Sequence, residues 1–296
     1  MHVLVSSCQV LSLRTSTFPV MQNDRNETGQ RRNTEHDEPG NGSGNLAVLE
    51  TVRPFSRLSA DDLAALARTT RTIEVSAHRQ IATADMHGDT SMILIRGRAK
   101  HSLLSQRGGD FVLEIVEAGD LLAEHVLVAP ERQPACVEAL QRCKLLLVPG
   151  TAARRAMQRC PAALADLACV LQDKLDQRND LIAALGLPLA ERVLWRLSQL
   201  AQRCGVIAGS RLLIRHGLSQ RDLAATIGVS RESLNRCLAS FARQDRIEVH
   251  RREIVLRHRE SLEQRSGSGI DSRIPFVSAA RPARRQCVGA TGTFGV

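Results

Sequence analysis

The stretch Leu218–Phe241, LSQRDLAATIGVSRESLNRCLASF, predicts two short helices joined by a tight turn. Ser219 is placed to cap the first helix, since a serine hydroxyl can accept a hydrogen bond from a free backbone N–H at a helix start. The first helix should run to about Ile227. Gly228 follows where a left-handed residue would end that helix, and Ser230 can cap the second. Two helices in this arrangement are typical of a helix-turn-helix.

The second of these helices has one apolar and one polar face. Its apolar residues recur at i, i+3, i+4 and i+7 and should face inward: Leu234, Cys237, Leu238 and Phe241. The polar face suits the major groove of DNA, because arginine can donate two bonds to guanine and glutamate can accept one from cytosine. We therefore expect base contacts from Arg231, Glu232, Asn235 and Arg236. An ordinary helical hairpin with a solvated charged face is the alternative that these residues leave open.

A β-hairpin is predicted directly after the helix pair, at Arg246–Arg257. Two short alternating runs are separated there by Arg251 and Arg252, which indicates a basic wing whose arginines contact phosphates. The tip has no glycine, so we expect a turn longer than two residues. From Arg211 to Arg259 the chain holds eleven arginines and five acidic residues, a net charge of +6. That local charge favours a nucleic-acid partner.

The composition of the whole chain agrees with a basic protein of two domains. It has 296 residues, 43% of them apolar, a net charge of +9 and a pI near 9.7, which favours a polyanionic partner. The eight cysteines never have C-x2-C spacing and the nine histidines form no cluster, so we predict no metal site. No apolar run is long enough for a membrane span. We expect a soluble cytoplasmic protein without membrane contact.

Upstream of residue 151 the chain has the pattern of an antiparallel β-protein. Residues 22–45 are polar and glycine-rich, and we predict a disordered leader over residues 1–45. Order is expected from Leu46, with a helix beginning at Ser59. Short alternating runs separated by turn residues then predict a β-roll, similar to a jelly roll, over residues 46–150. The expected strands are Thr72–Val75, Ser91–Ile95, Arg98–Leu104, Phe111–Val116, Ala135–Leu140 and Lys144–Val148.

A long helix is predicted at residues 161–186, within a helical region that spans 151–186. Its apolar stripe consists of Leu164, Leu167, Ala168, Leu171, Leu175, Ile182 and Leu185. The opposite side carries Asp166, Asp173, Lys174, Asp176 and Asp180. So long a stripe commonly packs against its copy in a dimer, and a helix lying on the β-roll is the alternative. A winged helix-turn-helix domain at 187–263 and a flexible tail at 264–296 complete an α+β fold.

The order of these parts resembles the Crp–Fnr superfamily of bacterial transcription regulators over roughly residues 46–262. The most specific match is VSRESLNR at Val229–Arg236, which is similar to the family's recognition-helix pattern S-R-E-[ST]-[VL]-x-R. The resemblance implies a homodimer that senses a signal through the β-roll, with double-stranded DNA and RNA polymerase as further partners. It also implies phosphate contacts from Ser219, Gln220 and Ser230.

The sensor half departs from the pattern of the cyclic-nucleotide-binding members. GDLLAEH at Gly119–His125 keeps Glu124 but has Ala123 where the family has glycine, and Arg132 stands one place early. The pair that reads adenine in the family aligns with Arg178–Asn179. The resemblance therefore gives four candidate effector residues: Glu124, Arg132, Arg178 and Asn179. We predict no cofactor, with a cyclic nucleotide held through Arg132 as the alternative.

Two functions remain from the sequence. The first is a sequence-specific transcription regulator that binds a near-palindromic operator as a dimer under control of a signal. The second is a ligand-binding β-roll whose C-terminal helical module binds a protein partner instead of DNA. No nucleophile, paired carboxylates or phosphate loop indicates an enzyme, so we predict no catalytic residue. A steep dependence of affinity on salt distinguishes DNA from a protein partner.

Overall fold

The computed structural model describes residues 42–82, 88–104, 110–129 and 135–257. Most of the predicted leader and the whole predicted tail lie outside these residues. The first helix, α1 (Gly42–Thr51), begins four residues before the expected start at Leu46. Asn45 ties that early turn to the protein, because its buried side chain donates to the Thr70 hydroxyl at 3.0 Å. Within the described ranges, no helix combines the length and the apolar character needed to cross a membrane.

Two further short helices, η1 (Phe55–Arg57) and α2 (Ala60–Ala67), complete the N-terminal segment. The helix start predicted at Ser59 is confirmed, since the Ser59 hydroxyl accepts from the backbone N–H of Asp62 at 3.2 Å. These helices bury Leu49, Phe55 and Leu66 in one cluster with strand residues of the β-roll. The N-terminal helices are therefore part of the β-roll domain.

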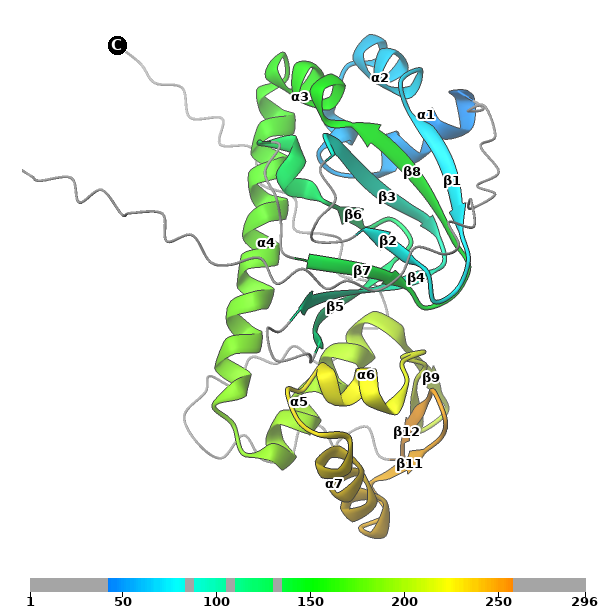
Figure 1. Cartoon of the computed structure of the whole chain (residues 1–296), viewed down its shortest axis with the longest axis vertical. Helices are drawn as coiled ribbons and strands as arrows, with labels where there is room; N and C mark the ends of the chain where they lie inside the picture. The colour runs from blue at the N-terminus through cyan, green and yellow to red at the C-terminus, as the bar shows by residue number, and fades with distance from the viewer. Residues whose placement is uncertain (1–41, 83–87, 105–109, 130–134, 258–296) are drawn as a thin grey trace, which may run out of the picture. The chain divides into compact units, whose positions relative to one another are not determined.

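Two four-stranded antiparallel sheets form the predicted β-roll (Figure 1). One sheet has the order β1-β8-β3-β6 and the other β2-β7-β4-β5. The strands are β1 (Arg71–Val75), β2 (Gln80–Ala82), β3 (Thr90–Arg96), β4 (Arg98–Leu104), β5 (Asp110–Glu117), β6 (Leu121–Leu122), β7 (Ala135–Ala139) and β8 (Cys143–Pro149). All six predicted strands are confirmed. The strands β2 and β6 were not predicted, because two or three residues are too few for an alternating pattern to be recognised.

The sheet that contains β4 and β5 has a different core on each of its two faces, because successive side chains in a strand point to opposite sides. Ala99 and Val116 pack inside the roll with residues of the other sheet. Val112 and Ile115 instead join the core of the C-terminal helices. One sheet thus contacts both the interior of the roll and the C-terminal domain.

The helical region after the roll is two helices, α3 (Gly150–Gln158) and α4 (Pro161–Leu185). The break between them lies at Arg159 and Cys160. Pro161 starts α4, where a missing backbone N–H has no cost in the first turn. The predicted long helix is confirmed, with its end one residue before Gly186.

The prediction was wrong for two charged residues of α4. Asp166 and Lys174 were expected on the solvent face, but Asp166 is buried against Arg57 at 3.0 Å and Lys174 pairs with Glu114 at 3.1 Å. Both therefore belong to the face that packs on the roll, which also buries Ala163, Leu167, Leu181 and Ala184.

A second apolar face of α4 is exposed in the single chain. Leu164, Leu175, Ile182 and Leu185 are 44%, 51%, 66% and 40% exposed, although all are large and apolar. A helix of this length that lay only on the roll would bury its leucines and expose charges. The buried face agrees with a helix that lies on the roll, and the exposed apolar face is the surface for which we predicted packing against a second copy.

The C-terminal domain consists of α5, a four-stranded sheet and the helix pair α6 and α7. Its sheet has the order β11-β12-β10-β9. The strands β9 and β10 were not predicted; they pair antiparallel through a turn at Gly209, whose φ is +61°. The elements are α5 (Leu189–Cys204), β9 (Gly205–Ala208), β10 (Arg211–Ile214), α6 (Gln220–Ala225), α7 (Arg231–Arg243), β11 (Ile247–Val249) and β12 (Ile254–Leu256).

Candidate nucleic-acid interface

The helix-turn-helix has the caps that the sequence predicts. The Ser219 hydroxyl accepts from the N–H of Asp222 at 3.1 Å, and the Ser230 hydroxyl accepts from the N–H of Ser233 at 3.2 Å. Gly228 has a φ of +73°, the left-handed conformation expected at the turn. Capped ends on both helices fix where α7 starts, and therefore which residues occupy its first turn.

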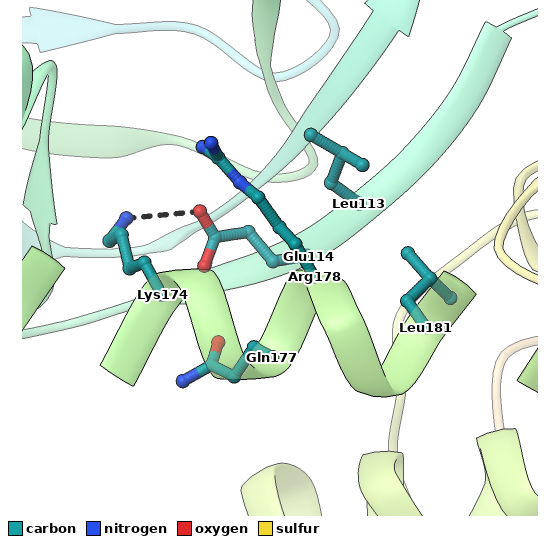
Figure 2. A pocket seen from close by; sticks show the side chains of 6 residues that line it. All are labelled: Leu113, Glu114, Lys174, Gln177, Arg178 and Leu181. Atoms are coloured by element: carbon teal, nitrogen blue, oxygen red, sulfur yellow. Dashed lines mark hydrogen bonds and ion pairs between the residues drawn. The ribbon is translucent and has the colours of Figure 1, made fainter. Parts of the chain in front are cut away.

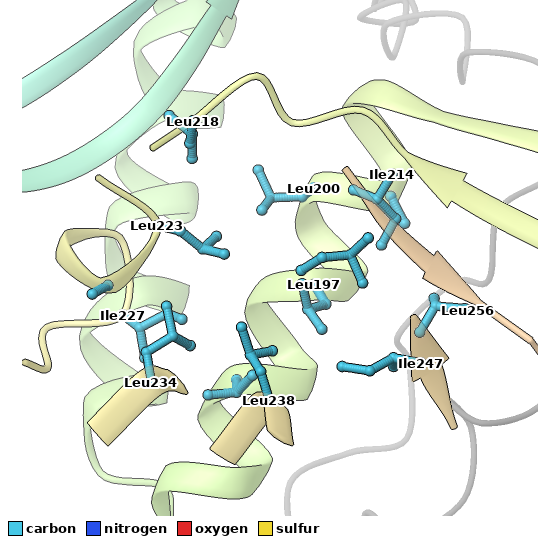
Figure 3. Packing of buried hydrophobic residues seen from close by; sticks show 14 of the residues in the cluster. Leu197, Leu200, Ile214, Leu218, Leu223, Ile227, Leu234, Leu238, Ile247 and Leu256 are labelled. Atoms are coloured by element: carbon cyan, nitrogen blue, oxygen red, sulfur yellow. The ribbon is translucent and has the colours of Figure 1, made fainter. Parts of the chain in front are cut away.

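The apolar face of α7 is buried in the core of the C-terminal domain. Leu234, Leu238 and Phe241 are at most 4% exposed, and Cys237 packs against the same cluster. Figure 3 shows Leu234 and Leu238 beside Leu223, Ile227 and Leu197, which come from α6, the turn and α5. This packing fixes the rotation of α7 about its own axis. Its opposite face must then point outward.

The outward face of α7 carries the four predicted base-contacting residues. Arg231, Glu232, Asn235 and Arg236 are all exposed. In the described part of the chain none of the salt bridges involves the three charged ones, and Arg236 makes only a 3.5 Å hydrogen bond to Ser233. Their side chains can therefore rearrange to meet base edges without first breaking an ion pair.

The wing divides its arginines into two groups. Those beside the strands are paired: Arg215, which follows β10, with Glu253 at 2.8 Å, and Arg257, which follows β12, with Glu248 at 2.9 Å. Arg251 and Arg252 at the tip are exposed, and no salt bridge among the described residues involves them. The acidic residues of the wing thus neutralise the arginines beside its strands. The positive charge of the two arginines at the tip is left without an ion-pair partner among the described residues. Residues 250–253 connect the two strands, and the backbone N–H of His250 donates to the carbonyl oxygen of Glu253 at 2.9 Å across the tip.

The N-terminus of α6 meets the outer face of the β-roll sheet. Lys100 of β4 is 6% exposed and pairs with Asp222 at 2.6 Å and with Glu138 at 3.0 Å. Burial raises the pKa of Asp222, but hydrogen bonds from Lys100 and Ser219 outweigh it and hold that pKa below its ordinary value. Ser219 is exposed and Gln220 half-buried beside this ion pair. Both remain candidates for phosphate contact.

A charged cluster joins β4, β5, α4 and the short helix η2 (Glu124–Leu127). Lys174 lies 3.1 Å from Glu114 and 3.4 Å from Glu124, and His101 lies 3.0 Å from Glu114. Figure 2 shows the Lys174–Glu114 pair in a pocket between β5 and α4. The pocket is lined by Leu113, Glu114, Lys174, Gln177, Arg178 and Leu181.

The cluster keeps its carboxylate and ammonium charged despite burial. Desolvation alone would raise the pKa of Glu114, but the charges of Lys174, His101 and Arg203 hold it well below its ordinary value. Desolvation would likewise lower the pKa of Lys174, but Glu114 and Glu124 raise it above the ordinary value. The charges of this cluster are thus neutralised by partners from within the chain.

Three of the four candidate effector residues lie in the described part of the chain. Glu124 is buried and paired with Lys174, and Arg178 lines the pocket. Asn179 is exposed and is not among the pocket residues, and Arg132 lies outside the described residues. Sequence reasoning missed Glu114, Lys174 and Lys100 as members of buried ion pairs. Lys174 and Glu114 are 60 residues apart along the chain and Lys100 and Asp222 are 122 apart, so no local pattern indicates these pairs.

Comparison with known proteins gives matches to both domains. The Crp-like helix-turn-helix domain matches residues 191–265, and the cyclic nucleotide-binding domain matches residues 72–160. A relative in Mycobacterium tuberculosis, described as a CRP-like cAMP-activated global transcriptional regulator, is 25% identical over 220 residues, which cover 74% of this chain and 98% of the relative.

Solved structures show the same fold. FixK2 from Bradyrhizobium japonicum has a TM-score of 0.58 at 19% identity, covering 66% of this chain and 96% of FixK2. A CooA variant from Carboxydothermus hydrogenoformans has a TM-score of 0.57 at 22% identity, covering 65% and 86%. The fold, the matched domains and the exposed basic face of α7 define a DNA-binding transcription regulator with a separate sensor domain. The chain belongs to the Crp–Fnr superfamily.

Proposed function

We propose that this regulator binds a near-palindromic DNA operator as a homodimer, in the cytoplasm, with RNA polymerase as its partner in transcription. Base edges are read by Arg231, Glu232, Asn235 and Arg236. Phosphates are contacted by Ser219, Gln220, Ser230, Arg251 and Arg252. The observation that carries the proposal is the outward face of α7, which is exposed and lacks salt bridges among the described residues. No catalytic role is proposed for any residue.

The second copy is proposed to pack on the exposed apolar face of α4. Leu164, Leu175 and Ile182 recur at intervals of eleven and seven residues, which keeps them on one side of the helix. Two such helices side by side would remove this surface from water. An operator read by two copies of α7 would have its half-sites about one helical turn of DNA apart, roughly 34 Å.

The signal is proposed to act through the charged cluster of the roll. The M. tuberculosis relative is described as cAMP-activated. We do not extend that ligand to this chain, because the Glu124 carboxylate is already paired with Lys174 at 3.4 Å. The alternative function, a helical module that binds a protein, is not favoured by the matched helix-turn-helix domain.

Selection from a pool of random duplexes tests the DNA-reading proposal. The full chain should enrich an inverted repeat, and Arg231→Ala and Glu232→Ala should each change the preferred base at one position of each half-site. Each good base contact is worth about 1–3 kcal/mol of discrimination. Matched controls are Arg68→Ala and Glu191→Ala, which remove exposed charges of the same kind outside α7. The proposal is wrong if the α7 variants keep the base preferences of the unchanged protein.

A further inference from the structure

Three segments meet at the side chain of Arg192, on the first turn of α5. Its Nη2 donates to the carbonyl oxygens of Leu185 at 2.8 Å and Leu187 at 2.9 Å. Its Nη1 donates to the carbonyl oxygen of Ile227 at 3.4 Å. Leu185 is the last residue of α4, and Ile227 directly precedes the glycine of the helix-turn-helix turn. One guanidinium therefore bridges the end of the long helix to the turn before α7.

An arginine is suited to this bridge for two reasons. The last carbonyls of a helix have no partner within the helix and carry partial negative charge, so a cation there is favourable. A guanidinium is planar and has five donors in a fixed fork, so it can reach carbonyls on two sides at once. In the described part of the chain no carboxylate forms a salt bridge with Arg192. Its charge is thus directed at backbone carbonyls alone.

A second contact at the same junction is independent of Arg192. A Cβ added at Gly228 would lie 3.3 Å from the Leu185 side chain and 3.1 Å from Phe111 of β5. The end of α4 and the turn of the helix-turn-helix therefore lie so close together that even one added carbon at Gly228 would be crowded, and Arg192 bonds to both. Neither partner can tilt without opening the junction.

We propose that Arg192 is a positioning residue that sets the angle between α4 and the helix-turn-helix, and thereby the half-site spacing that the dimer accepts. This inference rests on the proposed function, in which α4 joins the two copies and α7 reads each half-site. Arg192 itself touches no base in this arrangement. A change of tilt would move the two reading helices relative to each other, and one base-pair step is only about 3.4 Å.

The test uses the full chain and a set of duplexes that carry the half-site enriched by the unchanged protein. The half-site is placed as an inverted repeat at a series of spacings, and affinity is measured at each. The unchanged protein should prefer one spacing. Arg192→Lys keeps the charge but not the fork, and Arg192→Gln removes the charge. For both, the ratio between the best spacing and its neighbours should fall about tenfold, equal to about 1.4 kcal/mol, while base preference within the half-site stays the same.

Arg68→Lys is the matched control, since Arg68 is exposed at the end of α2. It should leave the spacing profile unchanged. The inference is overturned if both Arg192 variants keep the original profile, or if they lose affinity by one common factor at every spacing. Failure of both variants to fold would also overturn it, because the role of Arg192 would then be structural. If the unchanged protein enriches no inverted repeat, the proposed function fails together with this inference.

Discussion

Replacing Lys174 by methionine should destabilise the fold strongly at neutral pH. The side chains of Lys174, Glu114 and Glu124 are 17%, 15% and 5% exposed, so the ammonium is the partner of two buried carboxylates. Breaking a buried ion pair typically costs about 3–5 kcal/mol. His101 stays within 3.0 Å of Glu114, so we expect the lower end of that range, about 3 kcal/mol. For a chain of this size that is a fall in Tm of roughly 6–12 °C.

The sign of the pH dependence follows from the two pKa directions. The pKa of Glu114 is lowered from 4.5 in the folded state, so its stabilisation is present above pH 4.5 and is lost as the pH falls further. The pKa of Lys174 is raised from 10.5, so its stabilisation is present below pH 10.5 and is lost above the folded pKa. The variant should therefore show its full loss of stability, about 3 kcal/mol, between roughly pH 5 and pH 10. The difference should shrink in more acidic solution.

Urea unfolding at pH 7 and at pH 4 measures both parts of this prediction. Lys144→Met on β8 is the control, because Lys144 is half-buried and no salt bridge among the described residues involves it. Adding Glu114→Gln to Lys174→Met should recover part of the loss, since it removes the carboxylate left without its ammonium. A loss below about 1 kcal/mol, or an equal loss at both pH values, would refute the ion-pair account.

Three further predictions concern the turn, a buried histidine and the dimer. Gly228→Ala should cost about 1–2 kcal/mol because of its φ of +73°, and more because the new methyl group would be crowded by Phe111. Gly209→Ala, with a φ of +61° and open space around it, should cost only the part that comes from the backbone. Equal losses of stability in urea unfolding would contradict this. Burial lowers the pKa of His216 to about 4 from 6.5, so stability should fall by about 3 kcal/mol as the pH drops through that interval. The His216→Asn variant should lose less stability as the pH drops, because it lacks the imidazole that becomes protonated on unfolding. Urea unfolding at several pH values measures this, and a loss equal to that of the unchanged protein would argue against the role of His216. Ile182→Glu should yield a monomer in sedimentation, whereas Ala183→Glu, on a neighbouring exposed position, should stay dimeric; a dimeric Ile182 variant would rule out this face.

The helix-turn-helix could be predicted residue by residue because its determinants are local. The caps Ser219 and Ser230, the left-handed Gly228 and the inward spacing of Leu234 and Leu238 all act within a few residues of each other. Hydrogen bonds and helix periodicity over such short distances are set by the sequence itself. The exposure of the opposite face followed from the same periodicity.

The sensor domain was less predictable because its determinants are distant in the chain. Asp166 and Lys174 have the pattern of solvent-facing charges, but their partners Arg57 and Glu114 come from elements far away. A buried charge is tolerated only with such a partner, and helix periodicity contains no information about it. The bridge from Arg192 to three carbonyls was hidden for the same reason, since backbone acceptors leave no trace in a sequence.

The salt dependence of affinity for the selected duplex tests the central claim most directly. Each phosphate contact should contribute a slope of about −0.9 to a plot of log affinity against log salt concentration. The unchanged protein should give a steep slope, and Arg251→Ala with Arg252→Ala should reduce its magnitude by roughly 1.8 if each wing-tip arginine contacts one phosphate. An affinity that does not change with salt, or a slope that the double variant leaves intact, would contradict the account.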